Sequence, residues 1–247
     1  MSSAIDKTEH LVDRPPLREL VVERIQDMII DGRLQPGERL IETKMAEELG
    51  LSRGPIREAL QTLKRDGWVD QIPRRGTYVH QPTGAELDSF FSMRRLLDGF
   101  AAALAADSPP DEERLAELEA IIDETAQGLD SGDPRRIADL NEHFHLAVTS
   151  LAGNEVLVAV VNWMNGRNRW FTSPLAYAIA DRDTGNSLEG GLQLGERARH
   201  GHHRIFDAIR ARDSAAARKA AEEHVDEAWT TYRNLYALSV ASNLSET

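Results

Sequence analysis

The sequence predicts a mainly α-helical protein, in which an N-terminal winged helix-turn-helix precedes a C-terminal antiparallel bundle made only of helices. Three observations support this fold class. Within residues 15–80, three segments with apolar side chains at helical spacing are followed by two short β-like segments. From residue 85 onward, alanine and leucine recur at helical spacing, without β-branched alternation of strand length. Short loops separate these later segments, which is typical of an antiparallel bundle.

Composition limits the classes of function. The chain has 247 residues, enough for one large domain or two smaller ones, and 41% of them are hydrophobic. It contains no cysteine, which excludes disulfides, thiolate metal sites and a cysteine nucleophile. It shows neither an apolar signal region nor an apolar run long enough to cross a membrane. We therefore expect a cytoplasmic protein without a membrane partner.

The net charge of −12 argues against nucleic-acid binding until it is divided along the chain. Residues 1–80 carry 13 basic and 14 acidic side chains, whereas residues 81–247 carry 16 and 27. Within residues 51–80 the balance is 6 basic against 3 acidic side chains. Charges more than about 10 Å apart are largely screened in ordinary salt. A locally basic face is therefore compatible with an acidic C-terminal half.

The N-terminal part is predicted to hold a DNA-binding domain over residues 15–80, after a flexible tail at 1–14. The expected elements are a helix that ends near Gly32, helices over 42–49 and 52–66, and strands over 68–72 and 77–80. Gly67 is expected to cap the third helix, and Pro73 to Gly76 form the turn between the strands.

The third helix has the pattern of a recognition helix. Ser52 is a good N-cap residue, and an apolar stripe at helical spacing faces inward. Arg53 and Arg57 are four residues apart, so they share one face at the start of the helix. In a helix-turn-helix this is where base edges and phosphates are contacted.

A simpler interpretation is an amphipathic helix with two solvated arginines. The order of the elements favours DNA binding instead, because three helices are followed by a hairpin whose tip carries Arg74, Arg75 and Gly76. Such a tip suits close approach to the DNA backbone or the minor groove.

The C-terminal part is predicted to form a helical effector-binding and dimerisation domain over residues 85–240, after a short linker at 81–84. The expected helices cover about 85–106, 111–128, 134–151, 154–171, 188–211 and 213–240. Residues 172–187 are expected to be an irregular connection.

Histidines are concentrated in this part, where six of the eight lie beyond residue 140. His145, the cluster at 200–203 and His224 fall on three different predicted helices. Imidazole is a common transition-metal ligand, and three helices of a bundle can each direct one toward a shared centre. The alternative is three unrelated histidines, since ligands on separate helices leave no short motif.

The N-terminal part resembles the GntR family of bacterial transcription regulators. The matching residues are Gly32-x-Leu34-x-Pro36-Gly37-x-x-Leu40-x-Glu42, Leu49 to Arg53 with Pro55 to Leu60, Gly67, and Arg75-Gly76-Thr77. The resemblance implies DNA contacts by Arg53 and Arg57, with help from the preceding helix and the wing. The full set we expect is Ser52, Arg53, Arg57, Thr43, Lys44, Arg75 and Gly76.

The C-terminal part resembles the FCD effector domain of the FadR-like branch of that family. The matching residues are Asn141-x-x-Phe144-His145, His202-x-x-Ile205-x-x-Ala208-Ile209-x-x-x-Asp213, and His224. The resemblance implies a divalent transition metal, such as zinc, nickel or manganese, held by His145, His202 and His224. Asn141 stands where the family has an aspartate ligand, and a neutral amide oxygen is a weaker ligand. Arg94 is a candidate contact for a carboxylate effector.

These observations predict a ligand-responsive DNA-binding transcription regulator. We expect a homodimer on a near-palindromic double-stranded DNA operator. Its control would come from a small organic acid or sugar acid bound beside the metal. An alternative is a metal-dependent enzyme that uses the three histidines, since Glu142-x-x-His145 is half of the pattern of a di-iron carboxylate site. However, no second Glu-x-x-His, no His-Glu-x-x-His and no Gly-x-Ser-x-Gly occurs. A third possibility is a purely structural metal, or none.

Overall fold

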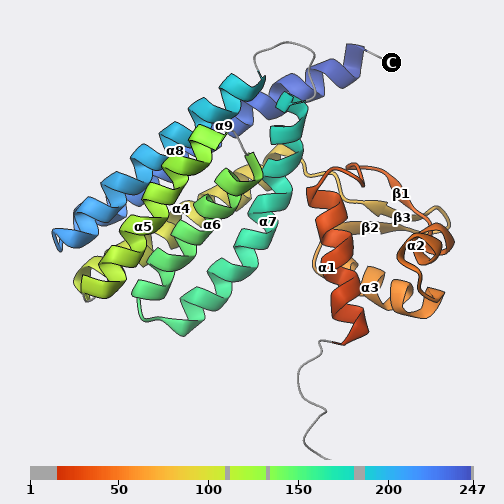
Figure 1. The fold of residues 1–247 in the computed structure, drawn as a ribbon. Helices are drawn as coiled ribbons and strands as arrows, with labels where there is room; N and C mark the ends of the chain where they lie inside the picture. The colour runs from red at the N-terminus through yellow and green to blue at the C-terminus, as the bar shows by residue number, and fades with distance from the viewer. Residues whose placement is uncertain (1–15, 109–111, 132–133, 181–186, 246–247) are drawn as a thin grey trace, which may run out of the picture. The chain divides into compact units, whose positions relative to one another are not determined.

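The computed structural model describes residues 16–108, 112–131, 134–180 and 187–245, which form two compact units (Figure 1). The first unit ends at Gln81 and the second begins at Pro82. Each unit is helical apart from a small sheet in the first. The predicted flexible tail at 1–14 lies outside the described residues.

The first unit is a winged helix-turn-helix, as expected. Its elements are α1 Leu17–Ile30, β1 Arg39–Leu40, α2 Glu42–Leu49, α3 Arg53–Arg65, β2 Val69–Ile72 and β3 Gly76–Val79. The helices pack through the apolar positions that the spacing predicts. The buried side chains include Val21, Ile25, Met28, Met45, Ile56, Leu60, Leu63 and Trp68. The apolar stripe of α3 is therefore fully used for packing, which leaves its opposite face in solvent.

Two glycines in the left-handed conformation set the direction of α3. Gly50 has φ of 66° just after α2, and Gly67 has φ of 74° after the C-cap of α3. Behind Gly67, the N–H of Trp68 donates to the carbonyl of Leu63 at 2.8 Å, which closes the helix in a Schellman motif. Gly50 makes the sharp turn between α2 and α3, so α3 is held as a separate recognition helix.

The wing is a three-stranded antiparallel sheet in the order β1-β3-β2. Its hairpin pairs Val69 with Val79 and Ile72 with Gly76. Strand β1, in which Arg39 pairs with Tyr78, was not predicted from the sequence. A strand of two residues carries no measurable alternation, so only its pairing with β3 identifies it.

The second unit begins with a capping box. The side chain of Thr83 accepts from the N–H of Glu86, and the carboxylate of Glu86 accepts from the N–H of Thr83. This interaction fixes the start of α4 at Gly84, inside the stretch that the sequence analysis assigned to a linker.

The second unit is a bundle of long helices (Figure 1). They are α4 Gly84–Asp107, α5 Glu112–Ser131, α6 Pro134–Leu151, α7 Glu155–Ala180, α8 Ser187–Arg210 and α9 Ser214–Ser245. Helix α9 packs along α4 and α8, while α5 packs against α6 and α8. The largest core cluster lies between them and includes Ile122, Phe144, Val148, Ile205 and Ile209. Polar residues that face this core are consequently shielded from water.

Two predicted boundaries in the bundle are wrong. Residues 172–180 are helical as the end of α7, not irregular, and α9 runs to Ser245. Pro174 lies within α7, and a proline inside a helix removes one backbone hydrogen bond and clashes with the carbonyl four residues before it. Leu175 and the alanines at 176, 178 and 180 are strong helix formers, which favours continuation of the helix to Ala180. Residues 181–186 of the predicted connection lie outside the described residues.

Among the residues that the structure describes, no helix combines the length and the apolar character that a membrane span requires.

Candidate functional site

The recognition-helix arginines lie at the exposed start of α3, and both pair with Glu42 of α2. Arg57 Nη2 is 2.9 Å from Glu42 Oε2, and Arg53 Nη2 is 3.3 Å from the same oxygen. The hydrogen bond from Arg57 lowers the pKa of Glu42, and the same bond raises the pKa of Arg57. Glu42, which the sequence analysis quoted only as part of a motif, holds the two guanidinium groups beside one another.

Three of the other expected DNA contacts are Ser52, Thr43 and Lys44. Ser52 takes the N-cap position of α3 with extended backbone, but its side chain makes no capping hydrogen bond. It is exposed and free to face a ligand, as are Thr43 and Lys44 on α2. Ser52 comes from the turn and the other two residues from the first helix of the helix-turn-helix.

The wing tip depends on an unusual backbone. Arg74 has φ of 63° and Gly76 has φ of 119°. A Cβ at Gly76 would lie 3.2 Å from Arg39 Nε, so glycine also allows the arginine of β1 to approach. Arg75 is exposed at this tip. The hairpin thus presents arginines on a tight turn, and the backbone conformation at residue 76 of this turn favours glycine.

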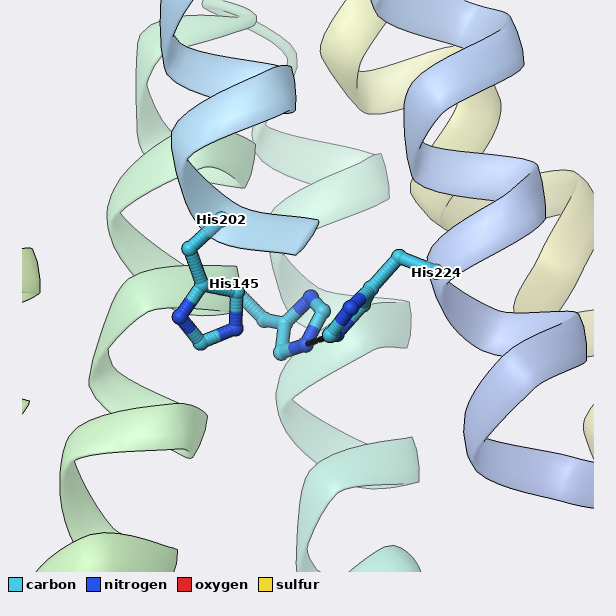
Figure 2. Close-up of side chains that lie close together, drawn as sticks. All are labelled: His145, His202 and His224. Atoms are coloured by element: carbon cyan, nitrogen blue, oxygen red, sulfur yellow. Dashed lines mark hydrogen bonds between the residues drawn. The ribbon is translucent and has the colours of Figure 1, made fainter. Parts of the chain in front are cut away.

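A second site lies inside the bundle, where His145 of α6, His202 of α8 and His224 of α9 come together (Figure 2). One ring nitrogen from each lies within 4.8 Å of the others, and all three side chains are buried. This is the juxtaposition that the sequence resemblance implied. His200 is exposed and His203 contacts Arg199 Nη1, so neither belongs to the cluster.

His202 is the most constrained of the three. Its ring is fully buried and stacks on Phe144, with centroids 3.9 Å apart. Neither Nδ1 nor Nε2 has a hydrogen-bond partner among the described residues. A buried polar group without a partner costs about 1–3 kcal/mol. The arrangement is therefore unfavourable unless something else satisfies this ring.

The three imidazoles are neutral at pH 7. Burial, reinforced by the charge of Arg94, lowers the pKa of His224 to about 3. Burial likewise lowers the pKa of His145 and of His202 well below the usual value. Neutral imidazole is the form that binds metal ions.

The spacing of the rings fits a tetrahedral ion. His145 Nε2 and His224 Nε2 face each other at 3.3 Å. Two ligands bound to zinc at about 2.0–2.1 Å in tetrahedral geometry are separated by roughly 3.3–3.4 Å. The two nitrogens thus already span one edge of such a coordination sphere.

Gly201 makes the cluster possible. A Cβ at this position would collide with Nδ1 of His224. The absence of a side chain therefore lets α9 bring His224 close to the backbone of α8, next to His202. This role of Gly201 was not predicted from the sequence.

Asp98 of α4 is a further buried residue that the sequence analysis missed. Its Oδ2 lies 3.3 Å from His145 Nδ1 and accepts a hydrogen bond from Arg94 Nε at 3.1 Å. Burial raises the pKa of Asp98, whereas Arg94 opposes that shift. The four-residue spacing of Arg94 and Asp98 was the available signal, because such pairs face each other on a helix.

A cavity of about 640 Å³ adjoins the histidines. His145, His224, Arg94 and Asn141 line it together with residues of α7, α8 and α9. Asn141 is half-buried and lies one turn before His145 on α6. The buried Oδ1 of Asn168, also in the wall, has no hydrogen-bond partner among the described residues. The cavity can therefore offer a ligand a cation, amide groups and two imidazoles.

Two family models match this chain. The model of bacterial regulatory proteins of the gntR family matches residues 12–79, and the FCD domain model matches residues 89–227. The matched segments contain, respectively, α3 with its arginines and all three buried histidines.

Similar proteins are transcription regulators. The HTH-type regulator YdhC of Bacillus subtilis is 29% identical over 215 residues, which is 86% of this chain and 90% of that protein. A probable D-xylose utilization operon repressor of Paenarthrobacter nicotinovorans is 30% identical over 214 residues, covering 84% and 87% of the two chains. The fold is that of the solved Escherichia coli McbR/YncC, with a TM-score of 0.72, 24% identity, and coverage of 90% and 100%.

Proposed function

The chain belongs to the gntR family of bacterial regulatory proteins and carries an FCD domain, and from this premise we propose a metal- and effector-controlled homodimer that binds a near-palindromic operator. The family and its relatives are DNA-binding transcription regulators rather than enzymes.

The DNA contacts are assigned to Arg53 and Arg57, with Ser52, Thr43, Lys44, Arg75 and Gly76 as auxiliary contacts. The pairing of Arg53 and Arg57 with Glu42 does not prevent this role. Both arginines are more than half exposed, and an exposed ion pair is worth about 0–1 kcal/mol. A bidentate contact with a base is worth about 1–3 kcal/mol of discrimination. A correct base can therefore draw an arginine away from Glu42.

Removing both arginines should strongly weaken specific binding. The test is the affinity for the DNA upstream of the chain's own coding sequence, measured by gel shift at fixed salt. The Arg53→Ala/Arg57→Ala variant should bind at least about 30-fold more weakly, because two contacts of about 1 kcal/mol or more are lost. Arg65→Ala, at the far end of α3, is the matched control and should bind almost normally. Equal binding by the double variant and the unchanged chain would contradict the assignment.

The homodimer is supported by an apolar surface on α4 and α7. Met93, Leu96 and Phe100 are exposed on α4, while Val156, Val160 and Trp163 are exposed on α7. The two helices pack together through Ala101, Leu157 and Val161. Exposed apolar side chains gathered on neighbouring helices mark interaction surfaces. A second copy is the occupant that we propose, because helix-turn-helix dimers bind two half-sites.

Charges on this surface should separate the dimer. Sedimentation equilibrium should give twice the 27.5 kDa chain mass for the unchanged protein and a single chain mass for Phe100→Glu/Trp163→Glu. Ile72→Glu is the control, since Ile72 and Phe100 are both 40% exposed. A double variant that keeps the dimer mass, or an unchanged chain that is monomeric, would refute this interface.

The metal is assigned to His145, His202 and His224, and the unpartnered ring of His202 is the observation that carries the assignment. A divalent transition ion, such as zinc, nickel or manganese, would accept a lone pair from each neutral ring. Asn141 is the proposed fourth ligand from the protein, through its amide oxygen. Because these ligands are all neutral, the bound ion keeps its full charge and attracts an anion.

The effector is assigned to the adjoining cavity. Arg94 lines this cavity. Burial lowers the pKa of His145 and of His224, and the positive charge of the nearby Arg94 lowers both further. A carboxylate there would meet both the guanidinium group and the ion. We therefore propose a small organic acid or sugar acid, whose hydroxyl groups suit Asn168 Oδ1.

Zinc should stabilise the chelator-treated protein, and His202→Phe should remove that effect. At about 100 times its Kd, a ligand that binds only the folded state adds about 2.7 kcal/mol. His202→Phe removes both unpartnered nitrogens but retains stacking on Phe144, so it should fold without metal and lose the response. His200→Phe is the matched control on the same helix. Both outcomes are measured by thermal unfolding.

The same assay tests the effector. Citrate, gluconate and lactate are added with and without zinc, and at least one acid should raise the melting temperature further only when zinc is present.

An unchanged melting temperature on adding zinc, or an equal zinc response of His202→Phe, would contradict the metal site.

A further inference from the structure

We propose that Asp98 is a positioning residue that fixes the orientation and the tautomer of His145, so that Nε2 of His145 is presented to the metal. The inference rests on the proposed metal site. It adds a carboxylate on α4 to a centre otherwise built from α6, α8 and α9.

The geometry separates the two nitrogens of His145. Nε2 lies 3.3 Å from Nε2 of His224, inside the cluster, whereas Nδ1 lies 3.3 Å from Oδ2 of Asp98. A neutral imidazole carries one proton. A carboxylate beside Nδ1 can only accept, so it favours the proton on Nδ1 and leaves the lone pair on Nε2.

Asp98 does not belong to the ligand set itself. The ring nitrogens point in different directions, so a group that contacts Nδ1 lies outside the coordination sphere of an ion bound at Nε2. A carboxylate in this outer position is a common partner of metal-binding histidines, where it fixes the ring and raises its basicity.

Arg94 holds Asp98 in this position. Its Nε donates to the same Oδ2 that faces His145, at 3.1 Å, and both side chains are more than nine-tenths buried. Buried charges persist when they are paired and hydrogen-bonded. The pair therefore keeps a carboxylate in the core, where an unpaired one would be unfavourable.

This arrangement joins the cavity to the metal centre. Arg94 lines the cavity, and its partner Asp98 contacts a proposed metal ligand. The chain Arg94–Asp98–His145 is thus a continuous set of contacts between the proposed effector site and the ion.

Zinc affinity and the tautomer of His145 test the inference together. In Asp98→Asn the side-chain amide can turn its nitrogen toward Nδ1, which favours the wrong tautomer. The zinc Kd, measured by competition with a chromophoric chelator, should rise about 10–100-fold. Long-range ¹H–¹⁵N spectra of the metal-free unchanged protein should show the His145 proton on Nδ1, and in Asp98→Asn a larger share on Nε2.

Asp207→Asn, an exposed carboxylate paired with Arg210 on α8, is the control and should leave both readouts unchanged. If Asp98→Asn alone fails to fold because Arg94 loses its partner, the neutral double variant Arg94→Gln/Asp98→Asn is measured in its place. A His145 proton on Nε2 in the unchanged protein overturns the inference. So does a folded variant whose zinc Kd stays within about threefold of normal. Failure of the unchanged protein to bind zinc overturns the metal site, and the spectra then decide the role of Asp98 alone.

Discussion

The bundle is organised around the buried imidazole of His202, which has no hydrogen-bond partner among the described residues. His202 is enclosed on every side, and both of its nitrogens lack hydrogen bonds among the described residues. Folding removes this ring from water, and the described residues supply no hydrogen-bonding group that compensates its polar atoms. The surrounding sequence preserves the arrangement: Phe144 stacks on the ring, and Gly201 makes room for His224. These features are costly for an empty core and suitable for an ion.

Charge is distributed differently over the two units. Residues 81–247 carry 27 acidic but only 16 basic side chains, while the recognition helix keeps a local excess of basic side chains. Even there, Glu42 partly neutralises Arg53 and Arg57. Because non-specific binding depends on the number of phosphates neutralised, this pairing limits attraction to arbitrary DNA. A specific base contact is strong enough to replace it.

Much of the fold could be predicted from the sequence, because long amphipathic segments have strong periodicity. The stripe formed by Ile56, Leu60 and Leu63 identified α3 and is buried. Short or interrupted elements were harder. The strand β1 has too few residues for a pattern, and residues 172–180, which were predicted to be irregular, continue α7. For β1, pairing with β3 decides the structure, not local preference.

The candidate sites were predictable only in part. Resemblance to a family pointed to the three histidines, but spacing could not show that they converge. Asp98 and Glu42 were missed because their importance comes from contacts with residues far along the chain. The assignments of DNA contacts, of Asn141 as a ligand and of Arg94 as an effector contact stay predictions.

The most direct test of the central claim is X-ray absorption spectroscopy of the zinc-loaded protein. The account predicts three imidazole nitrogens bound to zinc at about 2.0–2.1 Å together with oxygen ligation. It also predicts that His202→Phe lowers the number of imidazoles in the spectrum. A zinc environment made only of oxygen atoms, or a spectrum that is the same in His202→Phe, would contradict it.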